Sequence, residues 1–154
     1  EEVYDITDEQ RNMKITNKRA NFSYTLEKDR IETGVVLSGG EAKAVRTGHL
    51  DLSQSHAKVV NGEIFLINAN IPIQGATKYD STRMRKLLLH KREIISISTK
   101  MKQQKLTLVP VKMYTKGHLV KCELALGKPK REFEKKDSIK RKDIQREIER
   151  DLKI

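Results

Sequence analysis

Apolar and polar residues alternate in several short segments of this chain, and each of these segments predicts a β-strand. Between residues 21 and 26 the side chains of Phe22, Tyr24 and Leu26 occupy every second position, which is the period of a half-buried strand. Residues 33–37 predict a second strand. Residues 86–89, which contain three consecutive leucines, predict a third.

Two further pairs of strands are predicted as hairpins. Asn61-Gly62 separates the apolar runs 57–60 and 63–66, and this dipeptide favours a two-residue type I′ turn. A second hairpin joins residues 106–114 to 119–126 around Lys116 and Gly117. Its first arm changes apolar phase at Pro110, which predicts a β-bulge. Its second arm is expected to bury Val120, Cys122, Leu124 and Leu126.

Two segments have helical signals. Ser38 and Glu41 have the spacing of a capping box, so a short helix should follow and end near Gly48. It is expected to bury Ala42 and Val45 and to expose Lys43 and Arg46. A second helix should run from about residue 91 to 103, with His90 at its N-cap and with Ile94, Ile97 and Met101 on its buried stripe.

Together these elements predict a mainly β protein with two to three helices, built as a small antiparallel OB-like β-barrel. The barrel should span residues 14–127, after an acidic and disordered leader at 1–13. Residues 128–154 contain 11 basic and 7 acidic residues and no strand pattern. We therefore expect a basic, disordered C-terminal tail, in which Ile144, Ile148 and Leu152 indicate a helix that forms only against a partner.

The charge of the chain is concentrated between residues 83 and 121, where 11 Lys or Arg residues face a single acidic residue, Glu93. Such a segment repels itself unless a polyanion lies against it, and the counterions released from a phosphate backbone then contribute affinity. The pattern therefore predicts an RNA or DNA partner.

Other classes of function are disfavoured by what the sequence lacks. The single cysteine, Cys122, excludes an internal disulfide and suits a reducing cytoplasm. The four histidines show no metal-ligand spacing, so no metal or cofactor is expected. There is no pairing of nucleophile and base, no glycine-rich phosphate loop and no apolar run that would span a membrane. We expect a cytoplasmic monomer that is not an enzyme.

Four segments resemble the small protein B family, the SsrA-binding proteins that accompany transfer-messenger RNA in bacterial ribosome rescue. The similarity covers nearly all of residues 14–154. The matching segments are Asn17-Lys18-Arg19-Ala20, Gly34-Val35-Val36-Leu37 with Gly40-Glu41-Ala42-Lys43-Ala44-Val45-Arg46, Arg85-Lys86-Leu87-Leu88-Leu89-His90-Lys91-Arg92-Glu93, and Leu106-Thr107-Leu108-Val109-Pro110 followed by Lys112 and Tyr114.

This resemblance implies an adaptor whose barrel binds the tRNA-like domain of transfer-messenger RNA. Its tail would fold on the ribosome and probe the decoding centre of the small subunit and the empty mRNA channel. The RNA-binding candidates are Lys18, Arg19, Glu41, Lys43, Arg46, Arg85, Lys86, Leu88, His90, Lys91 and Lys121. The tail candidates are Lys130, Arg131, Phe133, Glu134, Lys135 and Lys136. Pro129 stands where the family usually has a glycine, which predicts a stiffer hinge.

Several assignments stay open at this stage. The capping box already explains Glu41, so we expect any effect of Glu41 on RNA to be indirect. Leu88 is either a core residue or an outward contact for a ribose or base, and His90 can cap a helix, meet RNA or do both. Phe133 has no core to join, which favours stacking on a base. The alternative function is a generic OB-type RNA-binding or ribosome-associated protein.

Overall fold

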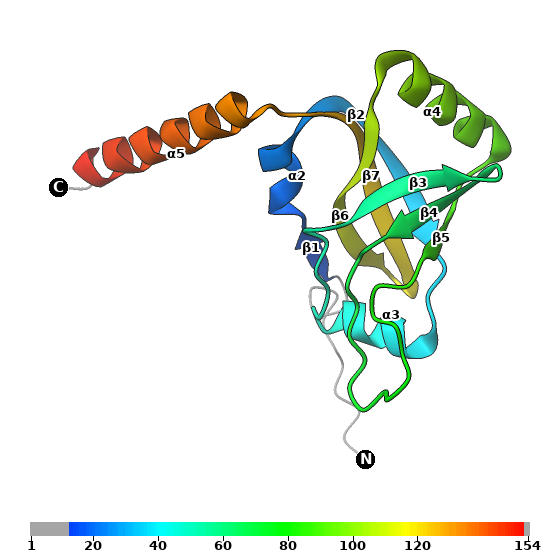
Figure 1. Ribbon diagram of the computed structural model, residues 1–154. Helices are drawn as coiled ribbons and strands as arrows, with labels where there is room; N and C mark the ends of the chain where they lie inside the picture. Colours follow the sequence, from blue (N-terminus) through cyan, green and yellow to red (C-terminus); the bar gives the residue numbers. More distant parts are fainter. Residues whose placement is uncertain (1–12, 153–154) are drawn as a thin grey trace.

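The computed structural model describes residues 13–152, in which seven antiparallel strands curl into a sheet that nearly closes into a ring (Figure 1). The hydrogen-bonded order is β1-β6-β3-β4-β5-β2-β7, and an additional pairing joins β7, at one end of this order, to β6, the neighbour of β1 at the other end. The strands are β1 (Lys14–Thr16), β2 (Tyr24–Val35), β3 (His56–Val60), β4 (Glu63–Ile67), β5 (Arg85–Leu88), β6 (Thr107–Lys116) and β7 (Leu119–Pro129). The helices of this part of the chain are α2 (Lys18–Ser23), α3 (Gly39–Arg46), α4 (Lys91–Gln104) and α5 (Glu132–Leu152).

Local sequence signals account for both hairpins. Asn61 and Gly62 have φ angles of 51° and 77°, so both residues of the turn are left-handed, as a type I′ turn requires. In the turn between Lys116 and Leu119, which face each other in the ladder, Gly117 has a φ of 62°. The register between β6 and β7 shifts between Pro110 and Lys112, which confirms the predicted bulge.

The first part of the sheet differs from the prediction. Residues 21–26 and 33–37 do not form two strands, because residues 24–35 form the single strand β2 and Phe22 lies in α2. Strand β2 pairs with β7 on both sides of an irregularity between Leu26 and Arg30. Because β7 pairs with β2 on both sides of this irregularity, the polar residues in the middle of β2 belong to the same strand. The alternation of apolar and polar residues does not reveal this.

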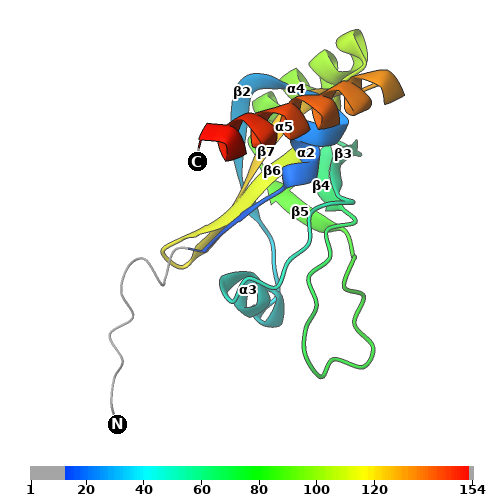
Figure 2. The ribbon, with the colours of Figure 1, turned by 90° about the vertical axis from the view of Figure 1, so that its left-hand side faces the viewer.

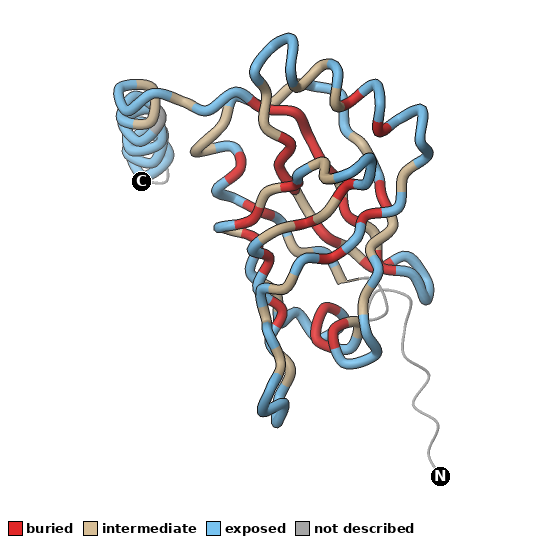
Figure 3. Tube along the Cα trace, turned by 45° about the vertical axis from the view of Figure 1, so that its right-hand side comes forward, coloured by how far each residue is buried: buried red, intermediate tan, exposed pale blue. Residues whose placement is uncertain are grey.

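The core lies inside the curled sheet and under α3 and α4 (Figure 3). The predicted inward face of β7 is confirmed, since Val120, Cys122, Leu124 and Leu126 are all buried. Helix α4 buries Ile94 and Ile97 and packs Met101 against the same cluster, as its pattern predicts. On α3 the buried residues are Glu41, Ala44 and Val45, whereas Ala42 is only half-buried, so the prediction for Ala42 is corrected.

The long connection between β4 and β5 hangs below the sheet beside α3 (Figure 2). Residues 71–82 contain neither helix nor strand, as predicted. This loop is long and has no secondary structure of its own, so its position depends on the side chains that join it to α3 and β5.

The C-terminal tail is a helix and not a disordered segment. Helix α5 contains 21 residues and projects away from the sheet (Figure 1). Residues 130–152 contain no Gly or Pro, and α5 has acidic residues in its first turn and Arg150 in its last. These features favour a helix even without a core. In the described part of the chain no helix is apolar and long enough to cross a bilayer.

The acidic leader predicted at residues 1–13 falls almost entirely on residues 1–12, which lie outside the described residues. Met13 is described, and its N–H donates to Oγ1 of Thr115 at 2.8 Å.

Candidate RNA-binding surface

Glu41 is fully buried and accepts hydrogen bonds from four residues. Its Oε1 accepts from the N–H of Ser38 at 2.9 Å, which completes the predicted capping box. Its Oε2 accepts from the Tyr79 hydroxyl at 2.8 Å and from Nε of Arg85 at 2.7 Å. Arg83 also forms an ion pair with Oε1. Glu41 therefore joins α3 to the loop between β4 and β5.

Burial by itself would raise the pKa of Glu41, but the hydrogen bonds from Arg83, Ser38, Tyr79 and Arg85 outweigh it and lower the pKa to about 2. The carboxylate is thus charged at neutral pH and acts as the anion of a buried cluster. The prediction that Glu41 acts indirectly agrees with this position, because no part of its side chain reaches the surface. The cluster also orders the loop, which the capping box alone did not predict.

The prediction that Arg85 contacts RNA is corrected, because the side chain of Arg85 has no exposed surface. Its guanidinium donates to the carbonyl oxygens of Ala69 at 2.6 Å and Ser81 at 2.8 Å, besides Glu41 and Tyr79. All of its partners belong to the protein. Arg85 is therefore a structural residue that holds the long loop against the sheet.

Five of the other candidates line one concave surface of about 670 Å³. We call this surface the β5 groove and define it by Lys86, Leu88, His90, Lys91 and Lys121. The alternation of β5 explains it: Arg85 and Leu87 point inward, whereas Lys86 and Leu88 point outward. Leu88 is 53% exposed, which answers the open question about its direction. His90 occupies the N-cap of α4, but its side chain makes no capping hydrogen bond.

Leu88 lies over a glycine of the neighbouring strand. Gly34 of β2 faces Leu88 in the ladder, and a Cβ at Gly34 would stand 3.3 Å from Cδ1 of Leu88. Such a contact is tighter than ordinary van der Waals packing, so the bare backbone of Gly34 leaves room for the leucine side chain. The groove thus combines three lysines and one exposed apolar side chain with three carboxylates, those of Glu32, Glu63 and Glu93.

Sequence analysis missed two residues beside this groove, Glu32 and Tyr114. Glu32 lines the groove and accepts a hydrogen bond from the Tyr114 hydroxyl. That hydrogen bond, helped by Lys116 and Lys121, lowers the pKa of Glu32, while burial and Glu32 raise the pKa of Tyr114 to about 12. Glu32 shares a face of β2 with Gly34, two residues later. The register shift between Leu26 and Arg30 means that the period of Tyr24 and Leu26 could not have located this face.

Not every cation between residues 83 and 121 is available to a partner. Arg83 and Arg85 belong to the Glu41 cluster. Lys100 pairs with Glu27 at 2.7 Å, and Lys112 pairs with Glu123 at 2.9 Å. Lys86 pairs with Glu63 at 3.1 Å, but both side chains are nearly half exposed, and such pairs exchange readily with water and with other anions. Lys91 and Lys121 complete the positive side of the groove.

Helix α3 borders the same end of the molecule. Lys43 and Arg46 are exposed on it, as predicted. Nη2 of Arg46 donates to the carbonyl oxygen of His118 at 2.8 Å, which joins α3 to the turn between β6 and β7. A smaller hollow of about 220 Å³ is shared by Ala42 of α3 with Leu88 and Lys121. Lys43 and Arg46 therefore lie on an element that flanks the β5 groove.

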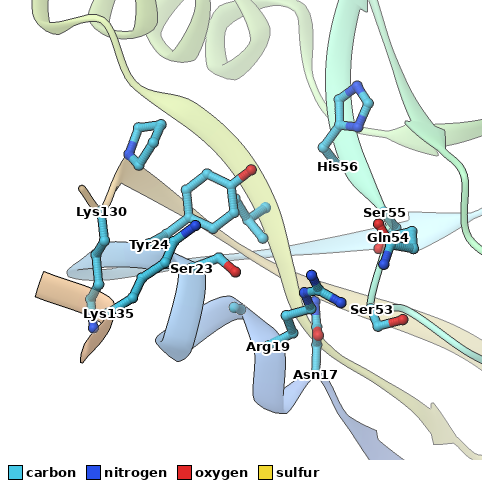
Figure 4. A pocket seen from close by; sticks show the side chains of 13 residues that line it. Asn17, Arg19, Ser23, Tyr24, Ser53, Gln54, Ser55, His56, Lys130 and Lys135 are labelled. Atoms are coloured by element: carbon cyan, nitrogen blue, oxygen red, sulfur yellow. The ribbon is translucent and has the colours of Figure 1, made fainter. Parts of the chain in front are cut away.

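The remaining candidates lie at the opposite end of the sheet. Lys18 and Arg19 belong to α2, and Arg19 lines a pocket with Lys130 and Lys135 at the start of α5 (Figure 4). Lys121 and Pro129 lie eight residues apart on β7, a span of roughly 26 Å in an extended strand. The cations predicted as one RNA-binding set therefore form two separate groups.

The other tail candidates follow this pocket along the chain. Arg131, Phe133 and Lys136 are exposed, and Glu134 accepts a hydrogen bond from the N–H of Arg131 at 3.3 Å. Within the residues that the structure describes, no group of three His, Cys, Asp or Glu side chains could hold a metal ion.

Comparison with known proteins identifies the family of this chain. Residues 14–154 match the family model described as SmpB protein. An SsrA-binding protein of Chloroflexus aggregans is 43% identical over 141 residues, which cover 89% of this chain and 89% of the relative. An SsrA-binding protein of Bacillus subtilis is 43% identical over 137 residues, which cover 87% of each chain.

A solved structure gives the same result. A chain of the structure described as "tmRNA-SmpB: a journey to the center of the bacterial ribosome" superposes with a TM-score of 0.64 and is 35% identical. The match covers 82% of this chain and 94% of that chain. The family match over residues 14–154 and the identities to these relatives show that this chain belongs to the SmpB protein family.

Proposed function

We propose that this chain is an adaptor that binds SsrA RNA, the transfer-messenger RNA, and acts with it on the ribosome in trans-translation. The observation that carries the proposal is the β5 groove, in which Lys86, Lys91 and Lys121 surround the exposed Leu88 on a buried scaffold. Relatives that match almost the whole chain are named SsrA-binding proteins. Family membership also confirms the prediction that the chain is not an enzyme, because the SmpB family is a non-enzymatic RNA-binding family.

In this proposal the β5 groove takes the tRNA-like domain of the RNA. Ammonium groups of Lys86, Lys91 and Lys121 neutralise backbone phosphates, and the released counterions supply a salt-dependent part of the affinity. Leu88 and His90 offer an apolar and a planar contact for a ribose or an unstacked base. Glu32 can accept a hydrogen bond from a ribose 2′-OH or an exocyclic amino group, which would add selectivity for an RNA feature over bare phosphate.

The Glu41 cluster contributes to RNA binding only by position. It fixes the start of α3, which presents Lys43 and Arg46, and it fixes Arg85 at the first residue of β5. Lys86 and Leu88 follow directly on that strand. The buried cluster thus sets the direction of the residues that face the RNA.

Helix α5 supplies the contact with the ribosome in this proposal. Its 21 residues make a rod of roughly 30 Å, which is long enough to lie along a channel that mRNA has vacated. We propose that Lys130, Arg131, Lys135 and Lys136 contact ribosomal RNA at the decoding centre. Phe133, which is 57% exposed, is placed to stack on a base there.

Competition for RNA tests the proposal. We expect SsrA RNA to displace a labelled SsrA fragment from the full chain at far lower concentration than bulk tRNA, in salt that suppresses non-specific binding. Lys121→Gln should weaken binding and reduce the slope of log K against log salt by roughly 0.9, whereas Lys28→Gln, on an exposed part of β2, should leave the slope nearly unchanged. Equal competition by bulk tRNA would mean a generic RNA-binding protein.

A further inference from the structure

A polar pocket of about 260 Å³ lies at the base of α5, where the tail leaves the barrel. Figure 4 shows that its walls come from α2, from the segment before β3, and from the junction of β7 with α5. We call it the α2 pocket and define it by Arg19, Tyr24, Ser53, His56, Lys130 and Lys135. It lies at the opposite end of β3 and β7 from the β5 groove.

The lining of the α2 pocket is positive. Arg19, Lys130 and Lys135 line it, and no Asp or Glu does. Three acidic side chains lie near the pocket: Asp51 accepts from the N–H of Ser53 at 2.9 Å, Glu134 accepts from the N–H of Arg131 at 3.3 Å, and Glu132, whose side chain is 86% exposed, lies 4.0 Å from Nζ of Lys135. Nζ of Lys130 donates to the carbonyl oxygen of Asn21 at 2.8 Å. Arg19 of α2 and Lys135 of α5 bring like charge to one cavity from two elements, and an anion between them would offset their repulsion.

We propose that the α2 pocket binds a backbone phosphate of an RNA chain and that this phosphate fixes the direction of α5. The proposal rests on the proposed function only in its choice of RNA. A guanidinium fork and two ammonium groups match the oxygens of a phosphodiester, and Ser53 and His56 can add hydrogen bonds. Tyr24 provides an aromatic wall beside the cations for the attached nucleoside.

The connection between barrel and tail explains why such an anion would act on α5. Strand β7 runs to Pro129, which faces Tyr24 in the ladder, and the N–H of Lys130 donates to the carbonyl oxygen of Ser23 at 2.9 Å. Backbone contacts therefore fix the chain as far as Lys130, and Arg131 is the one residue between Lys130 and α5. Since none of the α5 residues whose burial is described is buried, few other contacts define its direction.

Lys135 is the residue of α5 that reaches the pocket, whereas Arg19 and His56 belong to the barrel. A phosphate between Arg19 and Lys135 would therefore bridge the barrel to the first turns of α5. Loss of this phosphate would release α5 from the barrel without unfolding the helix. RNA binding and the direction of the tail are coupled in this way.

Variants of equal charge test the binding. Arg19→Gln/Lys135→Gln removes two cations from the pocket, and Lys14→Gln/Lys28→Gln removes two exposed cations outside the pocket and outside α5. Each variant and the unsubstituted chain are titrated with SsrA RNA and, separately, with isolated small ribosomal subunits over a range of salt. With at least one of these RNAs the pocket variant should lose about tenfold in affinity and roughly 0.7–0.9 in salt slope, while the control loses less than about twofold. A loss with SsrA RNA identifies that RNA as the source of the phosphate, whereas a loss with small subunits alone is decided by the distance measurement, because Lys135 is also proposed to contact the decoding centre.

A distance measurement tests the coupling without depending on which RNA is bound. Spin labels at Thr99→Cys on α4 and Ile148→Cys on α5 report the direction of the tail, because both positions are exposed and the only native cysteine, Cys122, is fully buried. Burial also raises the pKa of Cys122 to about 12, so it will not compete for label. Inorganic pyrophosphate or a short single-stranded RNA should narrow the distance distribution.

The same narrowing of the distance distribution should be absent when Arg19→Gln/Lys135→Gln is added to the labelled chain, and present with Lys14→Gln/Lys28→Gln. The proposal is overturned if the pocket and control variants bind both RNAs alike, or if the distances do not respond to pyrophosphate or RNA. Failure of the unsubstituted chain to prefer SsrA RNA would instead contradict the proposed function and leave the pyrophosphate result to decide the pocket.

Discussion

The β5 groove and α5 are both rich in cations, but they hold them in different ways. Lys86 and Lys121 lie on strands whose neighbouring positions, Leu87 and Cys122, are buried in the core. In α5 each residue whose burial is described is exposed or only half-buried. The fold therefore sets the geometry of the β5 groove. In contrast, α5 is a long, charged helix whose described side chains are not packed in a core. Substitutions in the groove must be chosen so that they spare the core, and substitutions in α5 should scarcely change stability.

Removing α5 is the largest test of this division. Because β7 continues to Pro129, two residues beyond the predicted barrel boundary at 127, the cut belongs after Arg131. We expect complete loss of rescue of stalled ribosomes, measured as peptide tagging in a reconstituted translation system, with Tm nearly unchanged and SsrA RNA still bound through the β5 groove. A matched control replaces α5 with a Gly/Ser linker of equal length. Loss of RNA binding itself would contradict the division between groove and tail.

Glu41→Gln should cause the largest change in stability. The amide cannot balance the charges of Arg83 and Arg85, and breaking a buried ion pair from one side costs about 3–5 kcal/mol. For a chain of this size we expect Tm to fall by roughly 10 °C, measured by calorimetry. Glu63→Gln, at the half-exposed partner of Lys86, is the control and should change stability by less than ~0.5 kcal/mol.

The RNA-binding readout of the same variant decides how Glu41 acts. If Glu41 acts by ordering α3 and the loop, then RNA affinity should fall together with stability. Abolished RNA binding at an unchanged Tm would show a direct role for the carboxylate and would contradict the positioning account.

The pH dependence of stability should reveal the same cluster. The folded-state pKa of Glu41 is about 2, below its ordinary value of 4.5, so its contribution is present above pH 4.5 and is lost as the pH falls toward 2. This shift corresponds to a loss of about 3 kcal/mol across that window. Urea unfolding at fixed pH values measures it. The Glu41→Gln variant should have a flatter curve there, and an identical curve would mean that other carboxylates dominate.

The adjacent residues Leu87 and Leu88 give the finest comparison. Leu87→Ala empties a core site and should cost about 2–5 kcal/mol of stability. Leu88→Ala removes an exposed side chain and should cost less than ~0.5 kcal/mol, yet it should weaken SsrA RNA binding by about fivefold. Urea unfolding and an RNA titration separate the two effects. If Leu88→Ala binds RNA normally, the apolar contact in the groove is not used.

Local signals in the sequence predicted those elements whose causes are local. Asn61-Gly62 specified one hairpin, Pro110 marked the bulge, and the spacing of Ile94 and Ile97 specified α4. The missed elements depend on distant partners. The three residues of β1 form a strand only because they pair with β6, where Lys14 faces Tyr114. Helix α2 begins where Asn17 donates to the carbonyl oxygen of Pro110 at 2.9 Å.

The candidate site could be predicted only in part for a similar reason. A run of like charge shows that cations are present, but it does not show which of them meet carboxylates from elsewhere in the chain. Arg85 meets Glu41, which lies 44 residues earlier in the sequence, and it is therefore buried. Lys86, Lys91 and Lys121 do share one surface, as predicted, whereas Lys18 and Arg19 belong to the other end of the sheet.

Strand β7 joins two other strands of the curled sheet, and this has a consequence for the folding of a newly synthesised chain. Strand β7 pairs with both β2 and β6, so a nascent chain that ends before residue 119 leaves both of these strands with an open edge. Open edges pair readily with other chains. The curled sheet can therefore be completed only after residues 119–129 have been synthesised, and a product terminated before them should be insoluble and not partly active.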